Sequence, residues 1–67
     1  MIHAKDDVNT LLHFASRVGD ILLIRKLLQQ GEDINAKNGA GQTALDIAEQ
    51  YQQSEAVLEL SRHGAQR

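Results

Sequence analysis

The stretch Thr10-Leu11-Leu12-His13-Phe14-Ala15 decides the fold, because a weaker copy of it, Thr43-Ala44-Leu45-Asp46-Ile47-Ala48, begins 33 residues further along the chain. An ungapped comparison of residues 10–34 with residues 43–67 extends the likeness over both segments. The identical pairs are Thr10/Thr43, Leu12/Leu45, Ala15/Ala48, Leu27/Leu60 and Gly31/Gly64, and Ile24 matches Val57 in kind. A fixed period of about 20 to 50 residues indicates stacked modules that are each too small to bury their own apolar face. The chain is therefore a tandem repeat.

The length and composition favour one small domain that gains stability from association. A chain of about 60 residues buries only about 60% of the surface of its unfolded form, so a thin core is expected. The sequence has no cysteine, so neither a disulfide nor a thiolate metal site reinforces it. Repeat modules stabilise each other through their interfaces and about three are normally needed, whereas this sequence shows two units. We therefore expect something to cover an open end.

The charge balance argues against binding to nucleic acid. Seven basic and nine acidic side chains give a formal charge of -2, whereas a surface that follows a phosphate backbone needs clustered Lys and Arg. The start of the chain lacks the apolar core of a signal peptide, and no stretch approaches the roughly 18 apolar residues of a membrane span. We expect a cytoplasmic protein that contacts neither nucleic acid nor a membrane.

The first unit has the pattern of a helical hairpin. Thr10 opens a helix that runs to about Val18, and Gly19 ends it, since glycine favours the left-handed conformation of a helix end. Asp20 then offers a cap to a second helix from Ile21 to Gln29 or Gln30, whose apolar residues fall on one face. The second unit repeats this order: residues 32–42 read as a turn, 43–52 as an inner helix and 54–63 as an outer helix.

This order of residues resembles the ankyrin repeat. The likeness is carried in the first unit by Thr10, Leu12, His13, Ala15, Gly19-Asp20, residues 21–31 and Asp33-Ile34-Asn35-Ala36-Lys37, and in the second by Gly41-Gln42-Thr43, Leu45, Ala48, Val57, Leu60 and Gly64-Ala65. It implies an all-α solenoid of two helical-hairpin repeats, joined by a β-hairpin-like loop. Residues 1–67 would form a single domain, with repeat one at about 5–37 and repeat two at about 38–67. Ser54 and Ser61 replace apolar residues of the first unit, so we expect the second unit to be a C-terminal cap.

The resemblance implies that the polar residues of the repeated motif are structural. His13 would hydrogen-bond to Thr10 and to the adjacent loop, and Asp46 would take over its place beside Thr43. His3 and His63 lie far from His13 in sequence, so a metal site is not expected. Asp46 and Glu49 share one helix, but a two-unit solenoid has too little volume for the partly dry cleft that acid-base catalysis requires. We expect no enzyme activity and no cofactor.

Ankyrin-like units bind other proteins through loop tips and the exposed ends of inner helices. Carried over to this sequence, the binding residues are Arg17, Val18, Lys37, Gly39, Ala40, Gln42, Gln50 and Tyr51, with Asp6, Asp7 and Asn9 beside them. Tyr51 is the single tyrosine, and an exposed aromatic residue with a hydroxyl group is a common contact anchor. Alternatively, Tyr51 covers the helical turn where Gln52 replaces a glycine.

Two other functions remain open at this point. The chain could assemble with itself through an open stacking face, for which Phe14, Leu22, Leu23 and Leu58 are the candidate residues; Leu22 and Leu58 could equally pack against Val18 or Leu60. It could also be a small inhibitor or immunity-type protein that blocks an enzyme. Lys26 and Glu59 occupy equivalent positions on the two outer helices, so we expect an ion pair between the units there.

Overall fold

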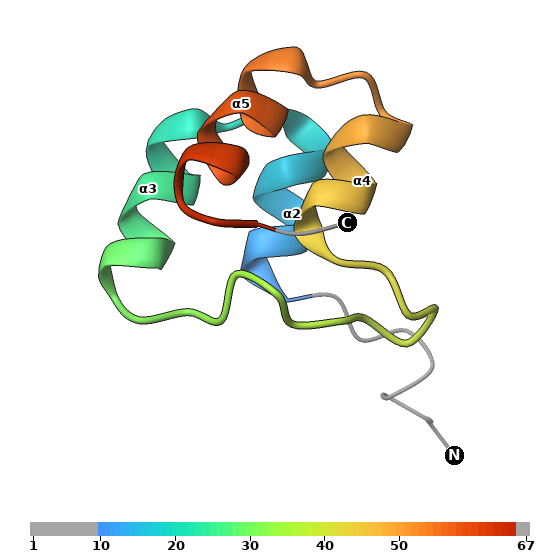
Figure 1. Ribbon diagram of the computed structural model, residues 1–67, viewed down its shortest axis with the longest axis horizontal. Coiled ribbons are helices and arrows are strands. Elements are labelled where there is room, and N and C mark those ends of the chain that lie inside the picture. Colours follow the sequence, from blue (N-terminus) through green and yellow to red (C-terminus); the bar gives the residue numbers. More distant parts are fainter. Residues whose placement is uncertain (1–9, 66–67) are drawn as a thin grey trace.

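The computed structural model describes residues 10–65, which form two stacked helical hairpins (Figure 1). The first hairpin consists of α2 (Leu11–Val18) and α3 (Ile21–Gln29), and the second of α4 (Ala44–Gln50) and α5 (Ser54–Arg62). The inner helices α2 and α4 contact each other, as do the outer helices α3 and α5. The expected all-α solenoid is confirmed. The predicted contact residues Asp6, Asp7 and Asn9 lie outside the described residues.

Both inner helices begin with the same reciprocal pair of hydrogen bonds. In α2, the backbone N–H of His13 donates to Thr10 Oγ1 at 3.2 Å, and the backbone N–H of Thr10 donates to His13 Nδ1 at 3.3 Å. In α4, Asp46 N–H donates to Thr43 Oγ1 at 3.2 Å, and Thr43 N–H donates to Asp46 Oδ2 at 3.0 Å. This capping box satisfies backbone donors that the first turn leaves free. Asp46 therefore does replace histidine structurally.

The turns between helices differ in one residue type. Gly19 ends α2 with φ 77°, and Gln52 adopts the same left-handed region with φ 56° after α4. A residue with a Cβ is less stable there than glycine, by about 1 to 2 kcal/mol. Asp20 caps α3 by accepting from Leu23 N–H at 3.1 Å, whereas Gln53, at the start of α5, makes no such cap. Gln53 Nε2 instead donates to Arg17 O at 2.8 Å and joins the two turns.

The core lies between the four helices and is built from leucine, isoleucine and alanine. Its buried members are Leu12, Ala15, Ile24, Leu27, Ala44, Leu45, Ala48, Ala56 and Leu60. The small alanine side chains let the neighbouring backbones approach closely, as the repeated motif predicted. Two polar residues of α2, His13 and Ser16, are buried with them, and Ser16 Oγ donates to Leu12 O at 2.7 Å. Every buried side-chain N or O atom in the described part of the chain has a hydrogen-bond partner.

The ion pair between the outer helices forms with Arg25, so the expected pairing of Lys26 with Glu59 is wrong. Arg25 Nε and Nη2 donate to the two carboxylate oxygens of Glu59 at 3.0 and 3.2 Å. Lys26 and Glu59 occupy equivalent positions, so their side chains point toward the same side of their respective units. The partner of Glu59 on α3 must instead point toward the second unit. Arg25, one residue before Lys26, is rotated by about 100° around the helix and reaches Glu59.

The loop between the hairpins is a compact turn, and no strand is formed within residues 10–65. Asn38 N–H donates to Gln42 O at 2.9 Å, and Gly41 N–H donates to Asn38 O at 3.0 Å. The Asn38 side chain also accepts from the N–H groups of Ala40 and Gln42, both at 2.9 Å. These bonds close the turn on itself, and Figure 1 shows the loop running past one end of the helices.

Candidate functional site

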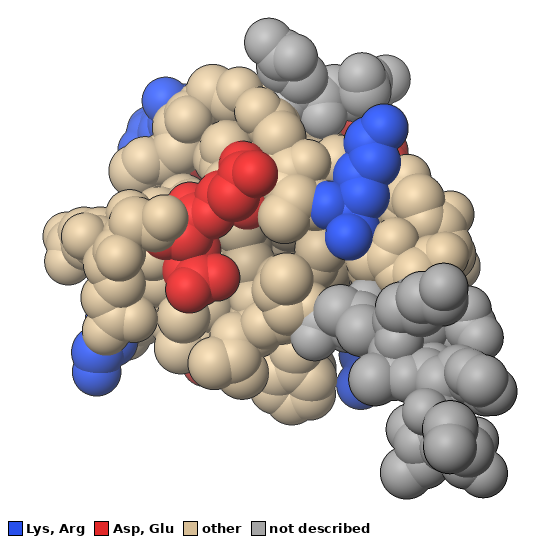
Figure 2. Space-filling model, turned by 90° about the horizontal axis from the view of Figure 1, so that it is seen from below, with Lys and Arg blue, Asp and Glu red and all other residues tan. Residues whose placement is uncertain are grey.

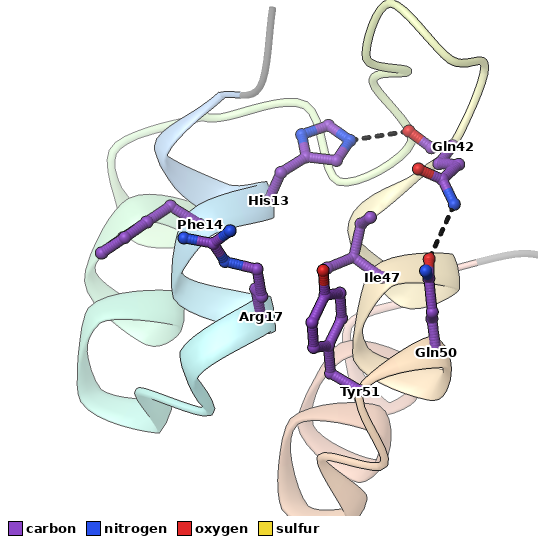
Figure 3. Close-up of a pocket in the computed structure, with 7 residues that line it drawn as sticks. All are labelled: His13, Phe14, Arg17, Gln42, Ile47, Gln50 and Tyr51. Atoms are coloured by element: carbon purple, nitrogen blue, oxygen red, sulfur yellow. Dashed lines mark hydrogen bonds between the residues drawn. The ribbon is translucent and has the colours of Figure 1, made fainter. Parts of the chain in front are cut away.

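A hollow of about 240 Å³ lies between α2 and α4, on the side of the inner helices. We call it the inner hollow. Its lining residues are His13, Phe14, Arg17, Gln42, Ile47, Gln50 and Tyr51 (Figure 3). Four of the binding residues predicted from the sequence, Arg17, Gln42, Gln50 and Tyr51, are therefore brought together. They come from the two inner helices, from the residue after α4 and from the loop, and they meet because α2 packs against α4.

His13 fixes the base of the inner hollow. Its Nε2 lies 2.7 Å from Gln42 O, and because a carbonyl oxygen only accepts, Nε2 must carry the hydrogen. Nδ1 is then the acceptor for the backbone N–H of Thr10, which matches the capping box. One neutral imidazole thus ties the first turn of α2 to the loop that precedes α4. The bond that the resemblance implied for His13 is confirmed.

Arg17 forms one wall together with Phe14. The two residues are three apart on α2 and lie on the same face of the helix. The Arg17 guanidinium carbon is 5.7 Å from the centroid of the Phe14 ring, within the range of a cation-π interaction. Arg17 is exposed, and no carboxylate within residues 10–65 forms an ion pair with it. The Phe14 ring therefore lies against the charge of Arg17.

The opposite wall carries the amide groups of Gln42 and Gln50 and the ring of Tyr51 (Figure 3). Gln42 Nε2 donates to Gln50 Oε1 at 3.0 Å, and Gln42 Oε1 accepts from Asn38 Nδ2 at 3.3 Å. Tyr51 follows the last turn of α4 and is 48% exposed. Its ring therefore lies at the end of the helix and at the surface of the inner hollow.

The other predicted binding residues lie outside the inner hollow. Lys37, Gly39 and Ala40 are exposed in the loop, and Val18 is about half exposed at the end of α2. Figure 2 views the molecule from the side of this loop: its Lys and Arg side chains are separated from one another, and Asp and Glu side chains form a group. Within the described residues this face carries no continuous basic surface of the kind that follows a phosphate backbone.

The residues considered for self-association come from both hairpins. Phe14 and Leu22 are exposed on the first hairpin, and Leu58 is exposed on α5. Leu23 is only partly exposed, because it packs against the core. Leu58 lines shallow hollows on the outer side, one of them shared with Ile21 and Arg25 of α3. Leu22 and Leu58 thus remain largely exposed and do not pack into the core.

Three lining residues and one supporting residue were not among the predicted binding residues, and the first of them, His13, was predicted to be structural. Phe14 was assigned to self-association, although its place three residues before Arg17 puts both on one helix face. Ile47 lies three residues before Gln50 and four before Tyr51, and this spacing likewise places them on one face of the helix. Asn38 was taken only as a turn former, and nothing in its sequence context indicated the bond to Gln42.

Nothing in the inner hollow assembles the groups of a reaction centre. Its seven lining residues include no carboxylate, and its one imidazole is buried and already bonded at both nitrogens, so they offer no acid-base pair. Between residues 10 and 65 no three His, Cys, Asp or Glu side chains gather as metal ligands would. Over the same residues, no helix has the length and apolar character needed to cross a membrane.

The fold and the site define a helical-repeat domain with a hollow between its inner helices. The chain matches the family model for ankyrin repeats (3 copies) over residues 1–66, and it belongs to this family. The family model contains three copies of the repeat, whereas two units were predicted from the sequence of this chain, which is a small difference. Ankyrin repeats generally mediate interactions between proteins, and the domain is typically non-catalytic.

Two similar proteins are enzymes in which the matched region is a small part. The E3 ubiquitin-protein ligase XBAT33 of Arabidopsis thaliana is 42% identical over 53 residues, which cover 79% of this chain and 10% of that protein. The palmitoyltransferase ZDHHC17 of Homo sapiens is 43% identical over 42 residues, 63% of this chain and 7% of that protein. The chain thus matches a tenth or less of the length of these relatives. No solved structure was found to match the chain.

Proposed function

We propose that this chain binds a partner protein through the inner hollow and performs no reaction of its own. The observation that carries the proposal is the convergence of Arg17, Gln50 and Tyr51 on one concave surface between two packed helices. Aromatic and arginine side chains are the residue types that most often dominate the energy of a protein interface. Because both walls belong to packed helices, a partner would bind without ordering the surface first.

The test is capture of a partner by photo-crosslinking. A photoreactive phenylalanine analogue at Ala40 places the label on the exposed loop two residues before Gln42, and the same analogue at Gln29 places it on the outer helix α3. We expect cross-linked species from the native cell with the label at Ala40, and their loss when Tyr51→Ala and Arg17→Ala are added. Circular dichroism checks that the helices of the double variant remain intact.

Controls on the outer helix make the result specific. Lys26→Ala with Gln29→Ala removes two exposed side chains of α3 that lie outside the inner hollow, and it should leave the cross-linked species unchanged. Equal cross-linking by the Tyr51/Arg17 variant and the wild-type chain would remove the support for this surface. A cross-linked enzyme whose activity falls on binding would identify the chain as an inhibitor within the same proposal.

Self-association is the second candidate function, because the two units differ in the exposure of equivalent residues. Leu11 is 61% and Phe14 is 47% exposed, whereas their counterparts Ala44 and Ile47 are 0% and 7% exposed. In the second unit these positions are covered by the first unit, since α2 packs on α4. The first unit therefore leaves open an apolar face of the kind that the second unit buries, and a second copy could cover it.

Sedimentation and thermal unfolding decide on this candidate. If two copies associate through the open face, the melting temperature rises with protein concentration and a dimer sediments. Leu11→Asp with Leu22→Asp should then give a monomer, while Leu58→Asp on α5 should not. A monomer with concentration-independent melting would rule out this function and would not affect the proposal for the inner hollow.

A further inference from the structure

We propose that the inner hollow receives an acidic side chain of the partner, a glutamate or aspartate with an apolar residue next to it. This inference rests on the proposed function, and it specifies the chemistry of the ligand. Three features of the structure support it: the direction of the amide hydrogen bonds, the sign of the charge at the hollow and the apolar groups beside that charge.

The amide groups at the inner hollow present a donor to the ligand. Asn38 Oδ1 accepts from two backbone N–H groups, those of Ala40 and Gln42, which only an oxygen can do. Asn38 must therefore point its NH₂ group at Gln42, and its Nδ2 lies 3.3 Å from Gln42 Oε1. Gln42 in turn must point its own NH₂ group at Gln50, whose Oε1 accepts at 3.0 Å. The loop backbone thereby fixes the orientation of three amides in sequence.

Gln50 is the last amide of this series; its oxygen accepts from Gln42, and its NH₂ group points outward. Gln50 is exposed, and because Oε1 receives the bond from Gln42, the NH₂ group is the part that faces a ligand. Arg17 across the hollow has donors only, and the Tyr51 hydroxyl can donate as well. His13, whose Nε2–H is used by Gln42 O, adds no acceptor. The accessible polar groups of the hollow therefore favour a ligand that accepts hydrogen bonds.

The charge at the inner hollow also favours an acceptor, and specifically an anionic one. Arg17 is the one charged side chain among the seven lining residues, although the chain as a whole has a formal charge of -2. A carboxylate can take two hydrogen bonds from a guanidinium in a planar pair, which a neutral acceptor cannot match. The Phe14 ring behind the guanidinium holds it without neutralising it. An anionic acceptor therefore fits better than a neutral amide.

The apolar lining determines what accompanies the carboxylate. Phe14 and Tyr51 expose about half of their surface, and the buried Ile47 lies beside Tyr51 on α4 (Figure 3). A free inorganic anion would leave the two rings in contact with water, whereas a peptide can cover them with a neighbouring apolar side chain. The combination of donors, positive charge and apolar surface thus corresponds to an acidic residue beside an apolar one.

The experiment selects ligands from a displayed library of random 12-residue peptides, each attached at its C-terminal end so that none has a free terminal carboxylate. Peptides that bind the wild-type chain and are lost on Tyr51→Ala define the hollow-dependent set. We expect this set to be enriched in Glu or Asp next to an apolar residue. One such peptide is then synthesised with Glu and with Gln at the enriched position, and the Glu form should bind about tenfold or more tightly.

Two matched substitutions test the donor at Gln50. Gln50→Glu keeps an acceptor for Gln42 Nε2 but turns the outward donor into a carboxylate, and Gln29→Glu adds the same charge on α3. We expect Gln50→Glu and Arg17→Gln each to weaken the Glu peptide about tenfold or more and to affect the Gln peptide much less, with little effect from Gln29→Glu. The binding of the Glu peptide should also weaken at higher salt concentration.

The outcomes separate this inference from the proposed function. A hollow-dependent set without acidic enrichment, or a Glu peptide no tighter than its Gln form, would overturn the acidic ligand while leaving the inner hollow as a binding surface. If no selected peptide is lost on Tyr51→Ala or Arg17→Gln, the binding surface itself is misplaced, and both proposals fail.

Discussion

Arg25 and Glu59 connect the outer helices α3 and α5 through two parallel hydrogen bonds of 3.0 and 3.2 Å. Glu59 is nearly buried, and His63 Nε2 lies 3.0 Å from its Oε2, one turn further along α5. The hydrogen bond from Arg25 and, after it, that from His63 hold the pKa of the Glu59 carboxyl below its usual value. The pair therefore contributes to the interface between the units as long as Glu59 is ionised.

The first prediction concerns Glu59→Gln and its pH dependence. A carboxyl group whose pKa is lower in the folded state contributes stability above its unfolded pKa, about 4.3, and loses it as the pH falls through the folded value. We expect Glu59→Gln to lower the free energy of unfolding at pH 7. The difference from the wild-type chain should shrink as the pH falls below about 4.3. Urea unfolding over a pH series measures it.

Glu55→Gln on the same helix is the control for this series. Glu55 is exposed and takes part in no described ion pair, so its replacement should change the free energy of unfolding little at any pH. A difference between wild-type and Glu59→Gln chains that stayed constant from pH 7 to pH 3 would contradict the assignment.

The second prediction concerns Gly19, which lies directly under the side chain of Gln53. A Cβ at Gly19 would come within 2.6 Å of Gln53 Oε1, and Gly19 has φ 77°. Gly19→Ala should destabilise the fold by about 2 to 3 kcal/mol, from the left-handed backbone and from the lost bond between Gln53 and Arg17 O. Thermal or urea unfolding gives the value.

Gly31 is the matched control, since it has φ 92° with nothing within 4 Å of a Cβ. Gly31→Ala should cost only the backbone contribution, about 1 to 2 kcal/mol. In a Gln53→Ala background, Gly19→Ala should cost the same as Gly31→Ala. If Gly19→Ala destabilised the Gln53→Ala variant as much as it destabilises the wild-type chain, Gly19 and Gln53 would not interact.

The fold could be predicted from the sequence because packing and capping recur at fixed positions. Thr43, Leu45 and Ala48 repeat Thr10, Leu12 and Ala15, and each pair has the same place in both units of the structure. The ion-pair partner of Glu59 could not be predicted from the repeated positions. Lys26 and its neighbour Arg25 are both long, exposed cations on α3, and the choice between them depends on the direction in which the units stack.

The candidate site was predicted in part for a related reason. Arg17, Gln50 and Tyr51 stand at the ends of inner helices, and the repeat spacing is sufficient to bring such ends together. The position of Gln42 and the outward donor of Gln50 depend on the hydrogen bonds of Asn38 within the loop. Those bonds are set by backbone geometry in a segment without regular structure, where periodicity carries no information.

The third prediction is that Gln52→Gly stabilises the chain. Gln52 has φ 56° at the turn between α4 and α5, where the first unit has a glycine. Glycine adopts this region freely, so we expect a gain of about 1 kcal/mol, reduced by the greater freedom of glycine in the unfolded chain. Gln53→Gly, one residue later, should destabilise, because it removes the bond to Arg17 O. A Gln52→Gly variant that melts below the wild-type chain would contradict this interpretation of the turn.

The last prediction separates the two roles of His13. His13→Asp keeps a carboxylate that can accept from Thr10 N–H, as Asp46 does from Thr43, but it loses the bond to Gln42 O and turns an acceptor toward it. His13→Ala loses both bonds and leaves a cavity, so it should cost about 2 to 4 kcal/mol, whereas Asp46→Ala should cost only about 1 kcal/mol.

Amide hydrogen exchange distinguishes these effects by location. His13→Asp should preserve protection in the first turn of α2 while raising exchange in the loop at Ala40 and Gln42, because the loop loses its anchor to α2. His13→Ala should raise exchange in both places, and Asp46→Ala only at the start of α4. Unchanged loop exchange in His13→Asp would mean that the bonds of Asn38 hold the loop alone. In that case the inner hollow would keep its shape without the imidazole, and His13 would matter only for the start of α2.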